Sequence, residues 1–434
     1  MFVPNGTHVT KAKVVRLEQI RLLGKIGKNK MRKMKNSGIE WIGEIPEDWE
    51  VGRIGELYTE RKEKVSDKDF MPLSVTMKGI LPQLASAAKS DAHDDRKLVR
   101  KGDFAINSRS DRRGSCGISD YDGSVSLINT ILTPRNNMNP NYYNWLFHTT
   151  LFADEFYKWG HGIVDDLWTT NWSDMKNITI PVPLVTTQQQ IADFLDKKCS
   201  EIDSVISKTR ETIEEYKKLK HSIITEVVTG NVKIENGKVC GKYDTYKDSG
   251  IEWIGEIPSE WEVIKCKHLL EVKSGDAIRN ELLSSNGKYQ VFGGGEILGY
   301  TDVYNANESN LLIGRVGARC GCVTRPFNKV FATDNALVVI PKDNRNFLYY
   351  VFISFDLNRL NTSNAQPLIT SSKVKNITIP VPLVTTQQQI SDFLDKKCSE
   401  IDKLITKKEQ LVVELESYKK SLIYEVVTGK KEMC

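Results

Sequence analysis

Apolar residues recur at mixed spacings of three and four along two long segments, which lie within residues 187–230 and 386–434. Heptad-like spacing over roughly forty residues, with Glu and Lys on the flanks, predicts a coiled-coil helix in each segment. Neither helix could bury its apolar stripe alone, so we expect the two helices to pack against each other, antiparallel. The apolar positions are Ile191, Leu195, Ile202, Val205, Ile213, Tyr216, Ile223 and Val227 in the first segment, and Ile390, Leu394, Ile401, Leu404, Leu411, Leu415, Leu422 and Val426 in the second.

Start and stop signals bound both helices. The Thr-x-x-Gln spacing of a capping box predicts that they begin at Thr187 and at Thr386. Both end in Glu-Val-Val-Thr-Gly, in which Gly230 and Gly429 are expected in the left-handed conformation that ends a helix. A short strand, Asn-Ile-Thr-Ile-Pro-Val-Pro, is predicted just before each helix, because its alternating residues end in prolines. At about 1.5 Å of rise per residue, each helix forms a rod of roughly 60 Å.

The chain repeats itself. Residues 177–203 recur as residues 376–402 with one substitution, at an offset of 199 residues. The segment SGIEWIGEIP opens each half, from Ser37 and from Ser249, at an offset of 212 residues. The two variable arms between these repeats differ in length and in most residues, although in both a strand pattern runs into a Gly and Arg loop and then Cys-Gly. We therefore expect one ancestral fold with two altered surfaces.

This arrangement predicts an α+β protein, in which two globular domains of mixed α/β structure are separated by two long antiparallel helices. The Trp41-Ile42 and Trp253-Ile254 turns, retained in both halves, are expected to clamp each arm to its helix. The strongly basic start of the chain is interpreted as a loose tail rather than a DNA-binding arm. The predicted segments are a basic leader (1–36), a first arm (37–186), a central helix (187–230), a linker (231–248), a second arm (249–385), and a final helix with tail (386–434).

Composition narrows the class of protein only slightly. The formal net charge of +5 and the pI of 8.5 are compatible with a nucleic-acid partner without requiring one. The sequence has neither an apolar run long enough to cross a membrane nor a recognisable secretion signal, so we expect a cytoplasmic protein. The eight cysteines are accordingly interpreted as reduced thiols, with a metal site at Cys320 and Cys322 as the less favoured alternative.

Catalytic signatures are not found in the sequence. It contains neither a GxxxxGK[ST] phosphate loop nor a dinucleotide fingerprint, and its six histidines form no recognisable triad. Glu60-Arg61-Lys62 has the Glu-x-Lys spacing of many nucleases, but such triplets arise by chance in a chain that is 27% charged. We therefore expect a non-catalytic protein without a cofactor or metal of its own.

Residues suited to the recognition of DNA gather in the arms instead. Arginine can form a bidentate contact with guanine, asparagine and glutamine can do the same with adenine, and lysine or serine can hold phosphates. Trp168 and Trp172 could stack on bases, although such residues more often belong to a core or its rim. The alternative for the arginine loops is a solvated surface, or pairing with Asp111 or Asp120. The candidate DNA-binding residues are Lys101, Asn107, Ser108, Arg109, Arg112, Arg113, Lys273, Tyr289, Arg315, Arg319, Arg325 and Gln366, and a basic group more suited to phosphate is Lys89, Arg96, Lys97, Arg100 and Lys101.

The repeated PVPLVTTQQQI, the EVVTG helix ends and the SGIEWIGEIP openings resemble the specificity subunit of a type I restriction-modification system. The resemblance extends from about Met31 to the end, and the segments LLIGRVGARCGCV and TDNALVVIP also resemble a recurrent target-recognition domain of that family. It implies that each arm reads one half of a split DNA sequence while the helix pair holds the halves at a fixed separation.

The resemblance also implies partners and their cofactors. The expected partners are double-stranded DNA, two modification subunits that methylate adenine with S-adenosylmethionine, and two restriction subunits that use ATP and Mg. Independently of the family, a partner with two-fold symmetry requires the same docking surface twice, which the repeated helices would supply. Two other classes remain open: a free-standing DNA-binding regulator, which would bind tightly without partners, and a coiled-coil adaptor, which would show no salt-dependent affinity for DNA.

Overall fold

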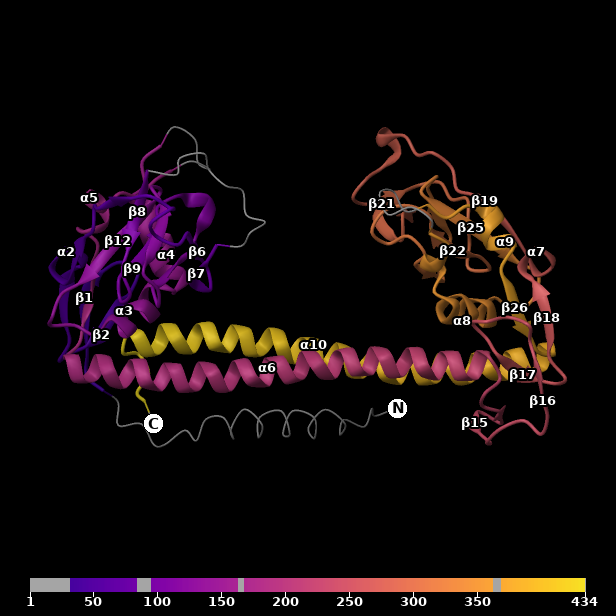
Figure 1. Ribbon diagram of the computed structural model, residues 1–434. Coiled ribbons are helices and arrows are strands. Elements are labelled where there is room, and N and C mark those ends of the chain that lie inside the picture. The colour runs from indigo at the N-terminus through magenta and orange to yellow at the C-terminus, as the bar shows by residue number, and fades with distance from the viewer. Residues whose placement is uncertain (1–31, 84–94, 163–167, 362–367, 434) are drawn as a thin grey trace, which may run out of the picture. The chain divides into compact units, whose positions relative to one another are not determined.

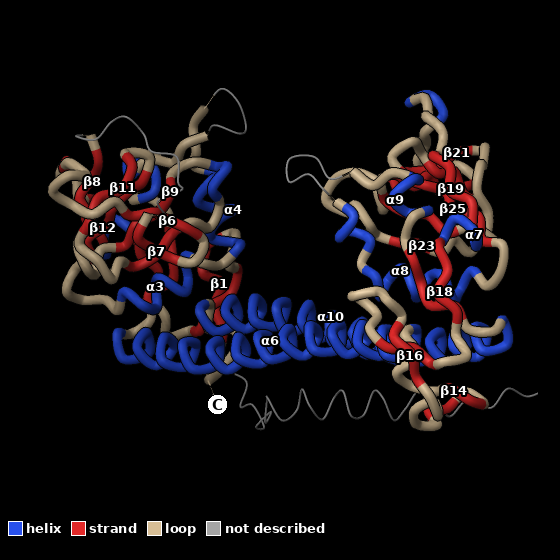
Figure 2. Tube along the Cα trace, turned by 45° about the vertical axis from the view of Figure 1, so that its right-hand side comes forward, coloured by secondary structure: helices blue, strands red, loops and turns tan. Residues whose placement is uncertain are grey.

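The computed structural model describes residues 32–83, 95–162, 168–361 and 368–433 (Figure 1, Figure 2). The chain forms two compact units, of which the first is discontinuous in sequence. This first unit combines the residues up to Ser207 with those from Val412 onward, and the second unit comprises residues 208–411. Each unit therefore contains one arm, the start of one long helix and the end of the other. The predicted basic leader lies outside the described residues, apart from residues 32–36.

The two long helices are α6 (Val185–Val228) and α10 (Val384–Val427), of 44 residues each. Both begin two residues before the predicted start, so the predicted capping boxes are wrong. In α6 the backbone N–H of Gln188 already donates to the carbonyl of Leu184, and its side-chain amide donates to the carbonyl of Pro183 at 2.7 Å. The helix thus starts two residues after Pro183, which directly follows the strand that ends at Val182.

The buried stripe of each helix departs from the predicted stripe most clearly at Val205 and Leu404, which occupy matching positions. Val205 and Leu404 are exposed, whereas their neighbours Ile206 and Ile405 are buried. The buried face passes through Cys199, which is 2% exposed. One heptad on from this cysteine lies Ile206 and not Val205. The predicted stripe did not include Cys199, and it had the wrong register there.

In the first unit the start of α6 runs antiparallel to the end of α10. Lys419 Nζ donates to both carboxylate oxygens of Asp203 at 2.7 Å. Nearer the start of α6, Ile191 lines a recess together with Val426, which is nearer the end of α10. Residue numbers rise along one helix as they fall along the other, so the two segments have opposite directions.

The second unit contains the equivalent contacts between the end of α6 and the start of α10. Lys220 Nζ lies 2.7 Å from an Asp402 carboxylate oxygen. Ile213 packs with Ile401 and Ile405 in a small apolar cluster. The two ion pairs of the units are related by the offset of 199 residues that relates the repeated sequences.

The first arm consists of small sheets flanked by short helices (Figure 1). Its strands are β1 (Met34–Ile39), β2 (Gly43–Pro46), β3 (Glu50–Arg53), β4 (Tyr58–Glu60), β5 (Lys64–Val65), β6 (Leu73–Thr76), β7 (Gly79–Pro82), β8 (Arg96–Val99), β9 (Phe104–Asn107), β10 (Cys116–Ile118), β11 (Gly123–Ser126), β12 (Asn129–Pro134) and β13 (Thr179–Val182). Its helices are α2 (Ile54–Leu57), α3 (Pro140–Phe147), α4 (Thr150–Lys158) and α5 (Trp172–Met175), with the 3-10 turn η1 (Ser110–Arg112). One sheet has the strand order β10-β9-β12-β4 and another has β11-β8-β5, and β13 pairs antiparallel with β3.

The second arm follows a related plan. Its strands, with those of the linker, are β14 (Ile234–Glu235), β15 (Lys238–Val239), β16 (Tyr246–Asp248), β17 (Glu256–Pro258), β18 (Glu262–Lys265), β19 (Leu270–Ser274), β20 (Tyr289–Gly293), β21 (Glu296–Thr301), β22 (Leu311–Gly314), β23 (Val323–Thr324), β24 (Val330–Ala332), β25 (Ala336–Pro341) and β26 (Thr378–Val381). Its helices are α7 (Cys266–Leu269), α8 (Arg345–Phe355) and α9 (Ser371–Lys375), with the turns η3 (Asn280–Leu282) and η4 (Leu357–Leu360). The order β19-β25-β22-β23 matches β4-β12-β9-β10 of the first arm, whereas the three-stranded sheet β21-β20-β24 has a parallel pair.

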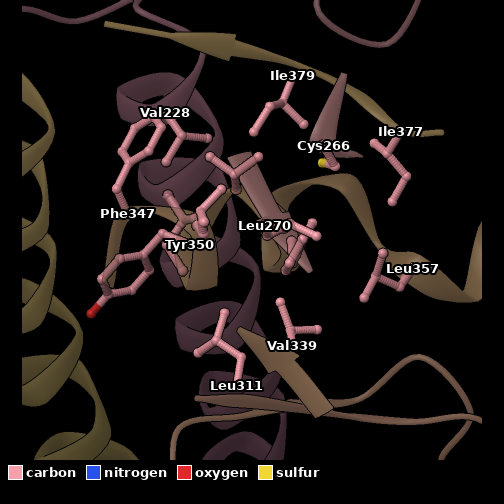
Figure 3. Packing of buried hydrophobic residues seen from close by; sticks show 14 of the residues in the cluster. Val228, Cys266, Leu270, Leu311, Val339, Phe347, Tyr350, Leu357, Ile377 and Ile379 are labelled. Atoms are coloured by element: carbon pink, nitrogen blue, oxygen red, sulfur yellow. The ribbon is translucent and has the colours of Figure 1, made fainter. Parts of the chain in front are cut away.

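The core of the second unit joins its sheet to both α8 and the end of α6 (Figure 3). Leu311 and Val339 come from β22 and β25, Phe347 and Tyr350 from α8, and Val228 from α6. The runs LLIG and ALVVIP are apolar almost throughout, which is typical of strands buried on both faces. Burial of this apolar surface fixes the arm on the long helix.

The opening segment of each arm packs against the end of a long helix. The predicted left-handed ends are confirmed, since φ is +72° at Gly429 and +79° at Gly230. A Cβ on Gly429 would lie 2.5 Å from Pro46 Cδ and 3.0 Å from Trp49, which is 1% exposed. The matching residues of the second unit are Gly230, Pro258 and Trp261.

The tryptophans that were predicted to form this clamp lie elsewhere. Trp41 packs edge-on against Phe152 at 6.0 Å, and Trp253 packs against Phe355 at 5.2 Å, so both tryptophans contact helices of their own arms. The Ile42 carbonyl does accept a hydrogen bond from Lys430 Nζ at 2.6 Å, just beyond α10. The turn therefore contacts the helix end through its backbone and not through its tryptophan.

Candidate nucleic-acid interface

The three arginines of the first arm lie on the loop between β9 and β10. Arg109 Nη2 donates to Asp111 at 3.2 Å, and Arg113 Nη1 donates to Asp154 at 2.8 Å. Arg112 has the most exposed side chain of the three, at 68%, and its Nε is 3.8 Å from Asp111. The structure thus brings the three predicted arginines together, with carboxylates beside them.

An open recess of about 450 Å³ lies beside this loop. The Arg113 guanidinium lies over the ring of Tyr157 at 5.4 Å. The backbone carbonyl of Trp168 accepts from the N–H of Ser110 at 2.9 Å, which fixes the predicted stacking residue next to the loop. The lining residues are Ser110, Asp111, Arg113, Asp154, Tyr157, Lys158 and Trp168. Cationic and aromatic groups are therefore adjacent here, together with the carboxylates of Asp111 and Asp154, and arginine and lysine are residues that commonly contact phosphates.

Asn107 and Ser108 support the loop from beneath and are only 6% and 4% exposed. Asn107 Oδ1 accepts from the backbone N–H of Arg109 at 3.1 Å, and the Ser108 hydroxyl lies 3.0 Å from that of Thr130. The side-chain oxygens of both residues thus have partners within the arm. The prediction that these two side chains contact DNA therefore conflicts with their burial.

Lys101 is exposed but is not near the arginine loop. It precedes β9 whereas the loop follows β9, so the two lie at opposite ends of that strand. The backbone N–H of Lys101 donates to Asp122 at 2.8 Å, and Arg100 pairs with the same carboxylate at 3.0 Å. The structure thus separates this lysine from the other candidates of the first arm.

Two residues of the predicted phosphate-binding group, Arg96 and Lys97, form hydrogen bonds within the arm. Arg96 Nε donates to the Ser124 hydroxyl at 2.9 Å, and Lys97 Nζ donates to the Asn129 carbonyl at 2.7 Å. Burial lowers the pKa of both basic groups. Neither is placed to meet a phosphate, and Lys89 lies outside the described residues.

Arg315 and Lys273 of the second arm lie at one end of the four-stranded sheet. Arg315 Nη1 donates to the Ser274 hydroxyl at 3.2 Å and to the Asp334 carbonyl at 3.4 Å. Ser274 is the last residue of β19, directly after Lys273, and Arg315 directly follows β22. Arg319 belongs to the same loop as Arg315. Arg315 and Arg319 therefore share one loop, and Lys273 lies near the end of the strand β19 that this loop contacts.

Tyr289 belongs to a different cluster, at the start of β20. Its ring lies 5.2 Å from that of Tyr304, with Lys288 Nζ at 5.4 Å. Lys329 Nζ lies 4.3 Å from the Tyr304 ring. This cluster is basic and aromatic, but it contains none of the candidate arginines. Gln366 lies outside the described residues.

Arg325 lies against α10 and is not part of the loop surface. Its Nη1 pairs with Asp395 at 2.7 Å, and its side chain is 17% exposed. The guanidinium stacks over Tyr349 at 4.1 Å, and the Tyr350 hydroxyl donates to the same carboxylate oxygen at 2.6 Å. Burial lowers the pKa of Arg325, but the bond to Asp395 and nearby charges outweigh it, so the pKa lies above its usual value. Its predicted role in DNA contact conflicts with this position.

Sequence reasoning missed the residues that join the arms to the long helices. In the first unit Asn139 Nδ2 donates to Gln189 Oε1 at 2.5 Å, and Trp145 Nε1 donates to Asp196 at 2.8 Å. The acceptors fall within the repeated sequence, which was the available signal. The matching pairs of the second unit are Asn344 with Gln388 and Tyr350 with Asp395.

The described part of the chain places no three His, Cys, Asp or Glu side chains so that they could hold a metal ion. Cys320 is buried and its thiol donates to the Arg315 carbonyl at 3.2 Å, whereas Cys322 is exposed. In the same residues no helix has both the length and the apolar character of a membrane span.

Known proteins are similar to this chain over most of its length. The model of the family described as "Type I restriction modification DNA specificity domain" matches residues 46–215 and 258–414. The type I restriction enzyme MjaVIII specificity subunit of Methanocaldococcus jannaschii is 24% identical, over 89% of this chain and 93% of that protein. The EcoprrI specificity subunit of Escherichia coli is 34% identical, over 25% of this chain and 27% of that protein.

A similar fold occurs in a solved structure described as "Structural basis underlying complex assembly and conformational transition of the type I R-M system". The two chains superpose with a TM-score of 0.68 at 15% identity, over 89% of this chain and 99% of the other. This likeness agrees with two recognition domains and long helices. Because the family model covers both halves, the chain belongs to the family of type I restriction-modification DNA specificity subunits.

Proposed function

We propose that each arm of this specificity subunit reads one half of a bipartite DNA target and that the long helices set the spacing between the halves. The observation that carries the proposal is the repeated framework. The contacts that join arm to helix recur in both halves at the offset of 199 residues on the helix side. The exposed loops of the two arms, in contrast, have different residues. Arms that contact the long helices in the same way but differ in their exposed loops are suited to the recognition of two different DNA sequences.

In this proposal α6 and α10 form an antiparallel coiled coil that acts as the spacer. The ion pairs of Asp203 with Lys419 and of Lys220 with Asp402 support this register. A continuous helix of 44 residues is roughly 66 Å long at about 1.5 Å per residue. That length corresponds to about two turns of DNA, at about 34 Å per turn. The half-sites are therefore expected to lie within two turns of each other.

Two modification subunits dock on the repeated surface and carry out the methylation of adenine with S-adenosylmethionine. Two restriction subunits, which bind ATP and Mg, join the complex. The same apolar pair is exposed at the start of each long helix: Leu184 and Val185 are 69% and 48% exposed, and Leu383 and Val384 are 73% and 59% exposed. A repeated apolar pair is the surface that a two-fold partner needs. The chain itself supplies recognition and assembly, and no catalytic step.

Exchange of one arm tests the modular reading. Replacing residues 37–176 with the corresponding segment of a relative should change one half of the methylated sequence and leave the other unchanged. The reciprocal exchange of residues 249–375 should change only the other half. The readout is genome-wide mapping of methylated adenines in cells that carry the modification subunit. A change in both halves after either exchange would contradict the proposal.

Removal of one apolar anchor tests the docking. Leu184→Asp should reduce the number of modification subunits per chain from two to one, because only one copy of the surface is altered. Leu383→Asp should do the same, and the double variant should bind none. Native mass spectrometry of the purified complex gives the stoichiometry. Retention of both subunits by the double variant would show that this pair does not dock them.

A further inference from the structure

The arginine loops of the two arms occupy the same place in the same sheet. In the first arm Ile106 pairs with Cys116, and in the second Ile313 pairs with Val323. Both strands and their partners are thus related by an offset of 207 residues. The loops between them, 108–115 and 315–322, therefore have equal length. The Cys-Gly pairs that occur in both arms do not correspond in this register, since Cys116 is equivalent to Val323 and not to Cys320.

Backbone hydrogen bonds support this register within the loops. The N–H of Ser115 donates to the Arg112 carbonyl at 3.1 Å, and the N–H of Cys322 donates to the Arg319 carbonyl at 3.1 Å. An equivalent hydrogen bond joins the two ends of each loop. The backbone N–H of Asn107 donates to the Ser115 carbonyl at 2.9 Å, and the N–H of Gly314 donates to the Cys322 carbonyl at 3.0 Å. Arg112 and Arg319 are therefore structural equivalents.

The two loops share only two of their eight residues in this register. One is a glycine with positive φ, +72° at Gly114 and +89° at Gly321, where the backbone turn requires it. The other is the arginine at the equivalent positions 112 and 319. The residues at the other equivalent positions differ between the loops. Ser108 corresponds to Arg315, Arg109 to Val316, Asp111 to Ala318 and Arg113 to Cys320.

The shared arginine is also the loosely held one in each loop. Arg112 and Arg319 have 68% and 60% of their side chains exposed, and their Nε atoms lie 3.8 and 3.9 Å from the nearest carboxylates. Arg319 Nη1 has a further long contact of 3.5 Å with the Gly295 carbonyl. Arg113 pairs at 2.8 Å and Arg315 bonds at 3.2 Å, so both are held more firmly. The shared guanidinium is thus free to meet a partner.

Two arms that read different half-sites have one DNA component in common, the sugar-phosphate backbone. We infer that Arg112 and Arg319 are equivalent phosphate anchors that set the position of each loop on the duplex, while the mismatched loop positions discriminate between bases. This inference rests on the proposed function, since it assumes that both arms bind DNA. An arginine suits the role because its guanidinium can hold two phosphate oxygens at once.

Affinity and salt dependence of the complete complex with its modification subunits test the inference. The probes are a duplex that carries the mapped methylation target and the same duplex with both half-sites scrambled. Arg319→Ala should weaken binding to both duplexes by about tenfold and reduce the slope of log affinity against log salt by about 1. Arg112→Ala should behave in the same way. Arg319→Lys should restore much of the affinity, and the control Lys242→Ala, in the exposed linker, should change neither quantity.

The methylated sequence distinguishes an anchor from a reader. Both alanine variants should methylate the wild-type sequence, at a lower rate. A relaxed or altered base in one half-site would make the arginine a base contact, and unchanged affinity and salt slope would remove it from the interface. Either result overturns the inference but leaves bipartite recognition by the wild type intact. A wild-type complex that methylates no bipartite sequence would instead refute the proposed function itself.

Discussion

Replacing Gly429 with alanine should destabilise the end of α10 far more than the same change at Gly38. Both glycines have φ of +72°, a conformation that costs an alanine about 1–2 kcal/mol at either position. Around Gly38 nothing lies within 4 Å of the new Cβ. At Gly429 the Cβ would lie 2.5 Å from Pro46 Cδ and 3.0 Å from Trp49. Gly38→Ala is therefore a control with the same backbone strain and no collision.

The collision adds a second free-energy term at Gly429. Both Pro46 and Trp49 are buried, so neither can move away without disturbing the packing around it. Overpacking of this kind destabilises by about 1–3 kcal/mol. Together with the backbone strain, Gly429→Ala should lose about 2–5 kcal/mol, against about 1–2 kcal/mol for Gly38→Ala.

Hydrogen exchange is the appropriate assay, because a protein with two compact units need not unfold in one step. Protection of amides in the last two turns of α10, followed by mass spectrometry, reports the local free energy of opening. Urea unfolding monitored by tryptophan fluorescence provides a global comparison. Equal losses for Gly429→Ala and Gly38→Ala would refute the argument, since they would mean that the added methyl group meets Pro46 and Trp49 at no cost in free energy.

Three further predictions concern the anchoring carboxylates, a buried thiol and the spacer. Asp395→Asn should lower the free energy of unfolding by about 2 kcal/mol, and Asp196→Asn should lower it by about 1 kcal/mol. The reason is that Asp395 accepts hydrogen bonds from an arginine and a tyrosine, whereas Asp196 accepts one from a tryptophan. Equal losses in urea unfolding would contradict this prediction. Burial raises the pKa of Cys116 to about 12 from 9.0, so this thiol should resist iodoacetamide at pH 8 until denaturant is added, whereas the exposed Cys240 and Cys322 should react in the folded protein. Because the folded state favours the protonated Cys116 thiol, this stabilisation is present below the unfolded pKa and is lost as pH rises from about 9 to 12. Peptide mapping by mass spectrometry identifies the alkylated thiols, and alkylation of Cys116 in the native protein at pH 8 would refute the prediction. Deleting one heptad from each helix, residues 208–214 and 408–414, keeps the antiparallel register of the two helices. This deletion should move the methylated half-sites about three base pairs closer together or abolish methylation. An unchanged gap between the half-sites would exclude a spacer role.

Several local elements could be predicted because their causes are local. The alternation in NITIPVP produced the strands β13 and β26, and the glycines after EVVT adopt the left-handed conformation at both helix ends. The helix starts were less predictable. A proline and a buried glutamine, Gln188 in α6, decide where the first turn closes, and the threonine signal two residues later had no influence on it.

The residues of the candidate interface were predictable by type but not by position. Arg109, Arg112 and Arg113 lie on one exposed loop as expected, because a short loop between paired strands must bring neighbours together. Burial of Asn107 depends on the strands around it, and the position of Arg325 depends on Asp395, which is distant in sequence. Such long-range contacts leave no trace in the composition of a loop.

The sequence by itself determined the duplication, the two long helices and the strands that lead into them, because periodicity and proline or glycine signals act over a few residues. Only the tertiary structure decided which side chains face solvent and which loop positions correspond. The pairing of the strands, and not the Cys-Gly pair that both arms contain, shows that Arg112 and Arg319 occupy equivalent loop positions. The physical reason is that a pairing register is fixed by hydrogen bonds and burial across the sheet, which the order of residues in one loop does not contain.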